Sequence, residues 1–286
     1  FFSLLEIFPA VTNPSNKPVW REPSMSELSE QTMQKFTDDL IDCERKSVAY
    51  PNLTEIYPNG TVSQAYMVQQ MFINKLAKSR VLGEIIGYKA ALTARPAQEA
   101  MNIGEAIVGV LFQKNQVTSE SLVIDRQVAV ETEFGYVTNA EIINPVISCD
   151  VHKLIVSYCP VVEIASPNLQ KRPTGIDLIA TNSATYKFIQ GKSQGTDEQI
   201  SSFDSIDNLT VELKMGDQSL HKESSGNIMF GQADALTWLI NEVLKRGYPI
   251  PKGSFLMTGS IGPAHPAKKG VYQADFRDLG SISISI

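Results

Sequence analysis

Hydrophobic residues are spaced three and four positions apart in two segments near the start of the chain, 24–50 and 61–80. This period predicts two amphipathic helices. Ser24 or Ser26 is the predicted N-cap of the first helix, because a serine hydroxyl accepts a hydrogen bond from a free backbone N–H group. The predicted core positions are Met33, Phe36, Leu40 and Ile41 in the first helix, and Tyr66, Met67, Met71, Ile73 and Leu76 in the second.

From Gly83 onward the hydrophobic residues form short runs separated by Gly, Pro and Asn, a pattern typical of β-strands. Helices are predicted only at about 149–158 and at 233–247, and the second ends in Gly247, a common C-terminal signal. Strands that do not alternate regularly with helices disfavour a doubly wound sheet. The predicted strands are 84–92, 106–112, 121–124, 128–137, 160–165, 209–215, 254–259, 270–276 and 281–286.

We therefore predict an α+β fold in which a helical N-terminal part precedes a mixed, mostly β core. Residues 1–24 are rich in Pro and Asn and lack periodicity, so we interpret them as an extended arm that could wrap around a neighbouring chain. Residues 25–82 are the helical part and residues 83–286 the β-rich core. We expect 25–286 to form one compact unit.

The composition fits a folded, soluble protein of 286 residues, with 43% hydrophobic residues, 20% charged residues and a net charge of −6. The sequence has no basic block, which disfavours nucleic-acid binding, and no apolar run approaches the roughly 20 residues of a membrane helix. Cys43, Cys149 and Cys159 form no C-x-x-C pair, which disfavours a disulfide framework or a zinc site. Sparse cysteines favour a cytoplasmic protein, although the start at Phe1 leaves an exported or processed form open.

The predicted strand 128–137 carries two acids on one face. Side chains alternate between the faces of a strand, so one face holds Ala129, Glu131, Glu133, Gly135 and Val137. Neighbouring carboxylates repel each other, and a face exposed to water is the simplest explanation for them. A bound divalent cation is the sharper explanation, because an all-oxygen site suits Mg²⁺ or Mn²⁺.

Two further charged residues stand inside apolar runs. Glu163 lies between Val162 and Ile164, where an unpaired carboxylate would be costly to bury. It could reach water at a strand end, form a salt bridge, or join the acid pair as a third metal ligand. Lys89, in GYKAALT, could extend from a buried stem to water, or its ammonium could meet a carboxylate or a substrate.

These segments occur in an order that resembles a known family. The sequence contains GYKAALT, the acid pair ETE, PVVEIA thirty residues later, TNSAT, and the ending FLMTGSIGPAHPAKKGVYQADFRDLGSISISI. This order resembles the 2-keto-4-pentenoate hydratase and 4-oxalocrotonate decarboxylase family of the fumarylacetoacetate hydrolase superfamily. The resemblance runs from about residue 35 to the C-terminus and includes SQAYMVQQ. Its specificity lies in the joint order and spacing of the motifs.

The resemblance implies a β-rich core of the fumarylacetoacetate hydrolase type that holds Mg²⁺ or Mn²⁺ through three acids, here Glu131, Glu133 and Glu163. In such enzymes the metal chelates the carboxylate and 2-oxo oxygens of a small 2-oxo acid and stabilises the enolate-like charge that develops. The family lysine falls on Lys89, which could orient the substrate or move a proton.

The resemblance also implies which residues surround the substrate. Ala129 and Gly135 would give clearance for metal and substrate. The family's polar Asn-Ser turn and its Thr-Gly-small segment imply substrate contacts at Asn182, Ser183, Thr258, Gly259 and Ser260. Family members commonly form homo-oligomers, so self-association is implied as well.

Three departures from the family pattern affect acid–base groups. Lys114 stands where hydratases commonly have an acid, Thr181 replaces an Asp, and Ala94 replaces a Ser or His. The resemblance implies a metal-dependent hydratase that adds water after enolisation. The alternatives are a 4-oxalocrotonate-type decarboxylase, or a degenerate member that binds metal or a 2-oxo acid without turnover. Hydrolysis of an acylpyruvate ranks lower, since no His lies near the matching motifs.

Overall fold

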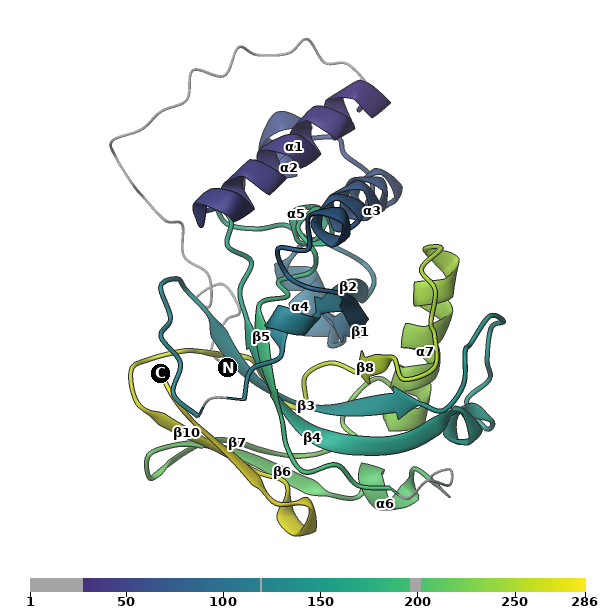
Figure 1. Cartoon of the computed structure of the whole chain (residues 1–286). Coiled ribbons are helices and arrows are strands. Elements are labelled where there is room, and N and C mark those ends of the chain that lie inside the picture. The colour runs from purple at the N-terminus through teal and green to yellow at the C-terminus, as the bar shows by residue number, and fades with distance from the viewer. Residues whose placement is uncertain (1–27, 119, 196–201) are drawn as a thin grey trace.

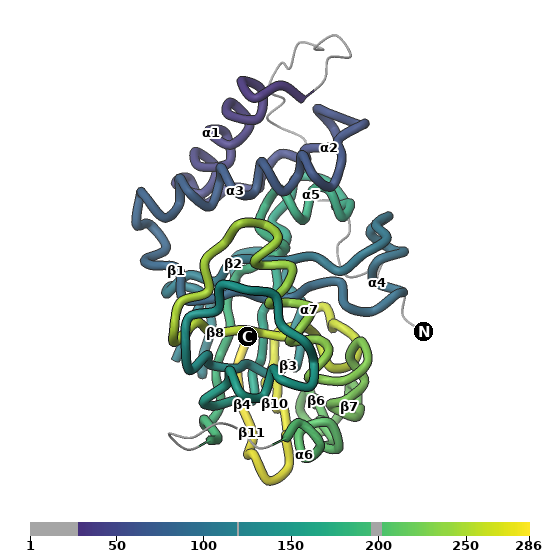
Figure 2. Tube along the Cα trace, turned by 90° about the vertical axis from the view of Figure 1, so that its right-hand side faces the viewer, coloured from purple at the N-terminus to yellow at the C-terminus, as the bar shows by residue number. Residues whose placement is uncertain are grey.

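The computed structural model describes residues 28–118, 120–195 and 202–286, so the predicted N-terminal arm, 1–24, lies outside the described residues. Helices α1, α2, α3 and α5 lie together at one end of the molecule, and the strands lie beneath them (Figure 1). A quarter turn shows the same two-part arrangement (Figure 2). The predicted α+β fold, with N-terminal helices followed by a β core, is confirmed. The domain boundaries themselves stay a prediction.

Helix α1 (Glu30–Lys46) starts later than predicted. Its N-cap is Ser29, whose hydroxyl accepts a hydrogen bond from the backbone N–H of Thr32. The predicted caps, Ser24 and Ser26, lie outside the described residues. All four predicted core positions of α1 are buried.

Helix α3 (Val62–Ser79) begins with a capping box formed by Thr61 and Gln64. Met67 is 48% exposed, so its prediction as a core residue is wrong. It points away from the buried side of the helix, which consists of Ala65, Tyr66, Val68, Gln69, Phe72, Ile73 and Leu76.

The strands form two sheets. The larger sheet has the order β2–β1–β8–β3–β4–β5, with β9 also paired to β3, and the smaller sheet has the order β11–β10–β6–β7. Strands β1 and β8 run parallel, whereas the other pairings among the described strands are antiparallel. The strands are β1 (Ile85–Ala91), β2 (Ile107–Phe112), β3 (Ala129–Thr138), β4 (Ile155–Ala165), β5 (Lys187–Gln190), β6 (Thr210–Met215), β7 (Gln218–Ser224), β8 (Phe255–Met257), β9 (His265–Pro266), β10 (Val271–Asp275) and β11 (Ser281–Ser285).

The remaining helices are mostly short connections between strands. The exception is α7, which extends over Gln232–Lys245 as the sequence predicts. The others are α2 (Leu53–Ile56), α4 (Arg95–Ala100), α5 (Gly175–Ala180) and α6 (Asp204–Asp207), together with 3₁₀ turns at Gln113–Asn115, Val151–Leu154 and Arg277–Leu279.

Two sequence predictions are wrong in this part of the chain. The helix predicted at 149–158 is a single 3₁₀ turn followed by the start of β4. The β-branched and aromatic residues of this segment pair with β3 and thereby extend that strand pair. The run 121–124 forms no strand, and only Ser121 makes an isolated bridge, to Ser285.

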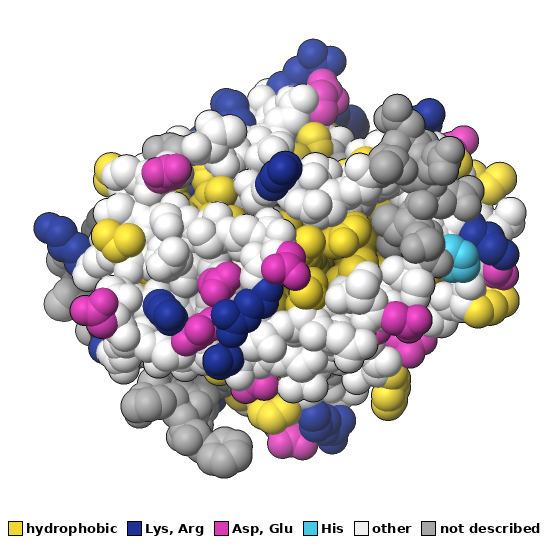
Figure 3. Space-filling view, turned by 90° about the horizontal axis from the view of Figure 1, so that it is seen from below, with side chains coloured by type: hydrophobic (Ala, Val, Ile, Leu, Met, Phe, Trp, Pro, Cys, Tyr) yellow, Lys and Arg dark blue, Asp and Glu magenta, His cyan; other side chains and the backbone are white. Residues whose placement is uncertain are grey.

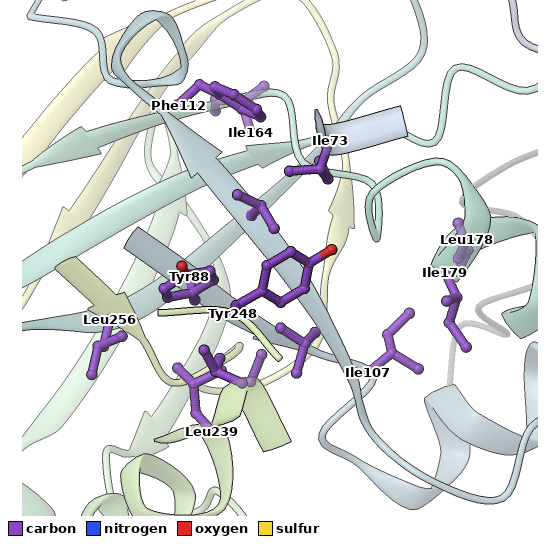
Figure 4. Close-up of a cluster of buried hydrophobic side chains, with 14 of the residues drawn as sticks. Ile73, Tyr88, Ile107, Phe112, Ile164, Leu178, Ile179, Leu239, Tyr248 and Leu256 are labelled. Carbon is purple, nitrogen blue, oxygen red and sulfur yellow. The ribbon is translucent and has the colours of Figure 1, made fainter. Parts of the chain in front are cut away.

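The main hydrophobic core joins the helices, the larger sheet and the smaller sheet. Figure 4 shows Ile73 of α3 and Leu239 of α7 in one cluster with Tyr88 and Leu256 of the sheet. The ring of Tyr88 lies tilted against that of Tyr248, with the ring centroids 5.7 Å apart, and the Tyr88 hydroxyl donates a hydrogen bond to the Pro249 carbonyl. This core packs against β1 and β8, which are neighbours in the larger sheet.

The surface seen in Figure 3 carries acidic and basic side chains intermixed, around a central group of hydrophobic side chains. Charges of both signs are therefore interspersed on this face. Among the described residues, no helix is long and apolar enough to cross a membrane.

Candidate metal centre

Three carboxylates converge on one face of the larger sheet. Strands β3 and β4 are antiparallel, and their register places Glu131 directly opposite Glu163 and Glu133 opposite Val161. One oxygen from each glutamate lies within 4.8 Å of the others. Within the described ranges, no other group of three His, Cys, Asp or Glu residues meets this condition.

The carboxylates are largely removed from water. Glu133 and Glu163 are each 1% exposed and Glu131 is partly buried, so the acid pair Glu131 and Glu133 is not a fully solvated strand face. Burial, followed by the nearby charge of Glu163, raises the pKa of Glu131 to about 7 and raises the pKa of Glu133 well above its usual range. Without a compensating cation, the folded chain therefore favours the protonated forms of Glu131 and Glu133.

Lys89 reaches the same group from the adjoining part of the sheet. It pairs with Met257 of β8, which in turn pairs with Gly135 of β3. The Lys89 ammonium donates a hydrogen bond to Glu163 Oε1 in an ion pair whose two side chains are each 2% exposed. Burial lowers the pKa of Lys89, but the charges of the three glutamates, Glu163 first, outweigh it and raise that pKa.

The second oxygen of Glu163 is free for a further ligand. Glu163 Oε2 is buried and has no hydrogen-bond partner among the described residues. Three ionised carboxylates and one ammonium carry a formal charge of −2, which a divalent cation would balance. Because all the donors are oxygens, the group fits a hard cation such as Mg²⁺ or Mn²⁺.

Of the predicted substrate contacts, two lie beside the carboxylates. The backbone N–H of Gly259 donates a hydrogen bond of 3.1 Å to Glu133 Oε2. The hydroxyl of Ser260 interacts with Glu131 and lowers the pKa of that carboxyl against the larger effect of burial. This loop therefore supports the carboxylates directly. By contrast, the hydroxyl of Thr258 donates to Gln232 Oε1 at 2.8 Å, in a buried network away from the glutamates.

Asn182 and Ser183 also have partners within the protein. The Asn182 amide bonds to both the N–H and the C=O of Val110, at 2.7 and 2.9 Å, and the Ser183 hydroxyl donates to the Val108 carbonyl at 2.7 Å. Both side chains therefore hold the turn at residues 182–184 against β2 through hydrogen bonds.

The sequence suggested that Gly135 leaves room for metal and substrate, but the structure shows a different need for a glycine at this position. A Cβ atom at Gly135 would lie 2.0 Å from the ring of Phe255. The space opposite Gly135 is therefore filled by that ring, which belongs to a small apolar cluster beside the carboxylates, formed by Leu111, Cys159, Val161, Phe188, Phe255 and Met257.

The three residues that depart from the family pattern are not part of the carboxylate group of Glu131, Glu133 and Glu163. Lys114 is exposed, in the 3₁₀ turn after β2, and Ala94 is exposed at the N-terminus of α4. Thr181 is buried and donates to the Asp177 carbonyl within α5. The lysine at position 114 therefore brings no ammonium into the buried interior.

Sequence reasoning missed two features of this region. His221 and His265 are hydrogen-bonded to each other at 2.9 Å, and His221 contacts the hydroxyl of Thr132, which lies between the two glutamates of β3. Thr185 carries a buried hydroxyl without a hydrogen-bond partner among the described residues. No local pattern indicates either feature, because the partners are far apart in the sequence.

Known proteins are similar to this chain in sequence and in fold. The chain is 25% identical over 228 residues to 4-oxalocrotonate decarboxylase of Pseudomonas sp. strain CF600, covering 77% of this chain and 83% of that protein. It is 25% identical over 271 residues to the TodF product hydratase of Pseudomonas putida F1, covering 91% and 98%. The chain is therefore similar in sequence to proteins named as hydratases and decarboxylases. No protein-family model matches it.

Solved structures give the same result for the fold. The structure of 4-oxalocrotonate decarboxylase from Pseudomonas putida G7, complexed with magnesium and adipate, superposes with a TM-score of 0.80 at 23% identity, covering 91% of this chain and 98% of that chain. Fumarylpyruvate hydrolase from Pseudomonas aeruginosa, in complex with Mn²⁺ and pyruvate, superposes with a TM-score of 0.54 at 11% identity, covering 69% and 87%. These structures show that the chain shares its fold with both proteins, in agreement with the sequence similarity.

Proposed function

We propose that this protein is a divalent-metal-dependent lyase that acts on a small 2-oxo or 2-hydroxydienoic acid, most like a 2-keto-4-pentenoate hydratase. The observation that carries the proposal is the buried group of Glu131, Glu133 and Glu163 with an unpaired oxygen on Glu163. These residues would hold Mg²⁺ or Mn²⁺, which would supply the positive charge that stabilises an enolate-like oxygen. Relatives named as hydratases and decarboxylases support this assignment.

Lys89 is the residue we assign to proton movement. Its buried ammonium is held by Glu163 Oε1, which leaves Glu163 Oε2 free for the metal, so one glutamate would orient both groups. An ammonium fixed in this way would deliver a proton to the substrate carbon chain. Gly259 and Ser260 would keep the other two carboxylates in position.

Two substrates separate the two lyase reactions. For a hydratase, the dienol absorbance of 2-hydroxypenta-2,4-dienoate decreases when Mg²⁺ or Mn²⁺ is added and stays constant with a chelator. For a decarboxylase, 2-oxohex-3-enedioate releases CO₂ under the same conditions. Absence of both metal-dependent signals would reject the proposed activity.

A binding protein without turnover is the second candidate, because Lys114 occupies the position of a family acid. However, the Lys114 side chain is exposed in the turn after β2 and leaves the buried carboxylates unchanged, which favours the lyase over the binding protein. Calorimetry with oxalate, which mimics an enolate, tests the difference: tight metal-dependent binding without turnover of either substrate would favour the binder. A cytoplasmic location and a homo-oligomer stay predictions, and light scattering of the purified chain would test the second.

A further inference from the structure

Buried polar atoms without hydrogen-bond partners are costly, so each one calls for an explanation. The described residues contain four such side-chain atoms: Glu163 Oε2, Thr185 Oγ1, Glu242 Oε2 and Arg246 Nε. The last two belong to one ion pair, in which Glu242 Oε2 lies 2.8 Å from Arg246 Nη2. The unexplained atoms are therefore those of Glu163 and Thr185.

Both unexplained oxygens lie beside Lys89. Glu163 pairs with the Lys89 ammonium. The Thr185 hydroxyl and the stem of Lys89 both lie over Gly109, where a Cβ atom would be 2.6 Å from Thr185 Oγ1 and 3.1 Å from Lys89 Cγ. Gly109 is directly opposite Lys89 in the β1–β2 register, so its missing side chain creates the space that the two groups share.

The turn before Thr185 is built to hold it there. Asn182, Ser183 and Ala184 have φ values of 71°, 56° and 58°, three consecutive left-handed residues without a glycine. Such strain persists only where the surroundings impose it, and it is common at functional sites. Here the side chains of Asn182 and Ser183 bond to Val110 and Val108, on either side of Gly109.

We propose that Thr185 is a substrate-binding residue, whose hydroxyl forms a hydrogen bond to an oxygen of the bound 2-oxo acid beside Lys89. Asn182 and Ser183 act through it, as positioning residues that fasten the turn over Gly109. This role rests on the proposed function. It explains why the fold keeps a buried hydroxyl without a partner: the partner arrives with the ligand.

The test compares Thr185→Val, which removes the hydroxyl but keeps the shape, with Thr185→Ser, which restores it. Oxalate is titrated calorimetrically into the full chain in the presence of Mn²⁺. We expect Thr185→Val to bind oxalate about 10-fold more weakly and Thr185→Ser to bind within about 3-fold of wild type, as expected for one hydrogen bond to a charged ligand. Mn²⁺ affinity should be the same in all three proteins.

Thermal unfolding without ligand provides the second readout. Thr185→Val should unfold at a midpoint no lower than wild type, because no hydrogen bond is lost. Thr37→Val is the control, since the buried Thr37 hydroxyl donates to the Gln34 carbonyl at 2.8 Å: it should lower the midpoint and leave oxalate affinity unchanged.

Two results would overturn the inference in distinguishable ways. If wild type binds oxalate and Thr185→Val binds it equally well, Thr185 has no role in binding while the proposed function stands. If wild type shows no metal-dependent oxalate binding at all, the proposed function fails and the role of Thr185 fails with it.

Discussion

Lys89→Met removes the ammonium that pairs with Glu163 and leaves an apolar side chain of similar length. Both partners are 2% exposed, so the remaining carboxylate loses its neutralising charge without gaining water. Removing one partner of a buried ion pair costs about 3–5 kcal/mol, and repulsion from Glu131 and Glu133 acts in the same direction. We expect a loss of this size in the free energy of unfolding, measured by urea denaturation at pH 8 without divalent metal.

A surface ion pair provides the control for this measurement. Lys75 lies 2.5 Å from Asp38, whose side chain is 63% exposed, so Lys75→Met should cost about 1 kcal/mol or less. Mg²⁺ should stabilise Lys89→Met more than it stabilises wild type, because the cation replaces the missing positive charge. A Lys89→Met protein that is no less stable than Lys75→Met would refute the neutralising role of Lys89.

Three further predictions concern the same region. The pKa of Glu131 is about 7 in the folded chain against an ordinary 4.5, so its contribution to the stability of the metal-free protein is largest below about pH 4.5 and disappears as the pH rises through 7. Mg²⁺ needs the ionised form of Glu131, so the Mg²⁺ affinity measured by calorimetry should fall about fivefold between pH 7 and pH 6. Gly135→Ala should cost about 1–3 kcal/mol in urea denaturation because of the clash with Phe255, whereas Gly104→Ala, which meets nothing within 4 Å, should cost far less. Asn182→Gly should be more stable than Asn182→Ala in the same assay, because glycine accepts the φ of 71°; equal stabilities would remove the strain argument for this turn.

The sequence predicted the β3 strand and its acid pair closely because side-chain alternation is a local property. The predicted strand 128–137 is Ala129–Thr138 in the structure. Periodicity gave the wrong element for the segment before Glu163, because its mixed apolar run is compatible with either a helix or a strand. Pairing with β3 makes it a strand. Strands β5 and β7 were not predicted, because KFIQ is only four residues long and QSLHKES is largely polar.

The chemistry of the site was predictable in part for the same reason. Glu131 and Glu133 share a face by alternation alone, whereas the approach of Glu163 depends on the strand register and that of Lys89 on two further strand pairings. Thr185 could not be predicted, because its significance comes from a missing partner, and only the three-dimensional arrangement over Gly109 shows that the partner is missing.

The central claim is that the three glutamates bind a divalent cation, and titration of Mg²⁺ into wild type and into the double variant Glu131→Gln/Glu133→Gln tests it most directly. We predict one site per chain in wild type and, at a free Mg²⁺ concentration 100 times Kd, a gain of about 2.7 kcal/mol in the free energy of unfolding. The folded double variant should show neither the site nor the gain. Equal Mg²⁺ responses of the two proteins, or no response from either, would contradict the claim.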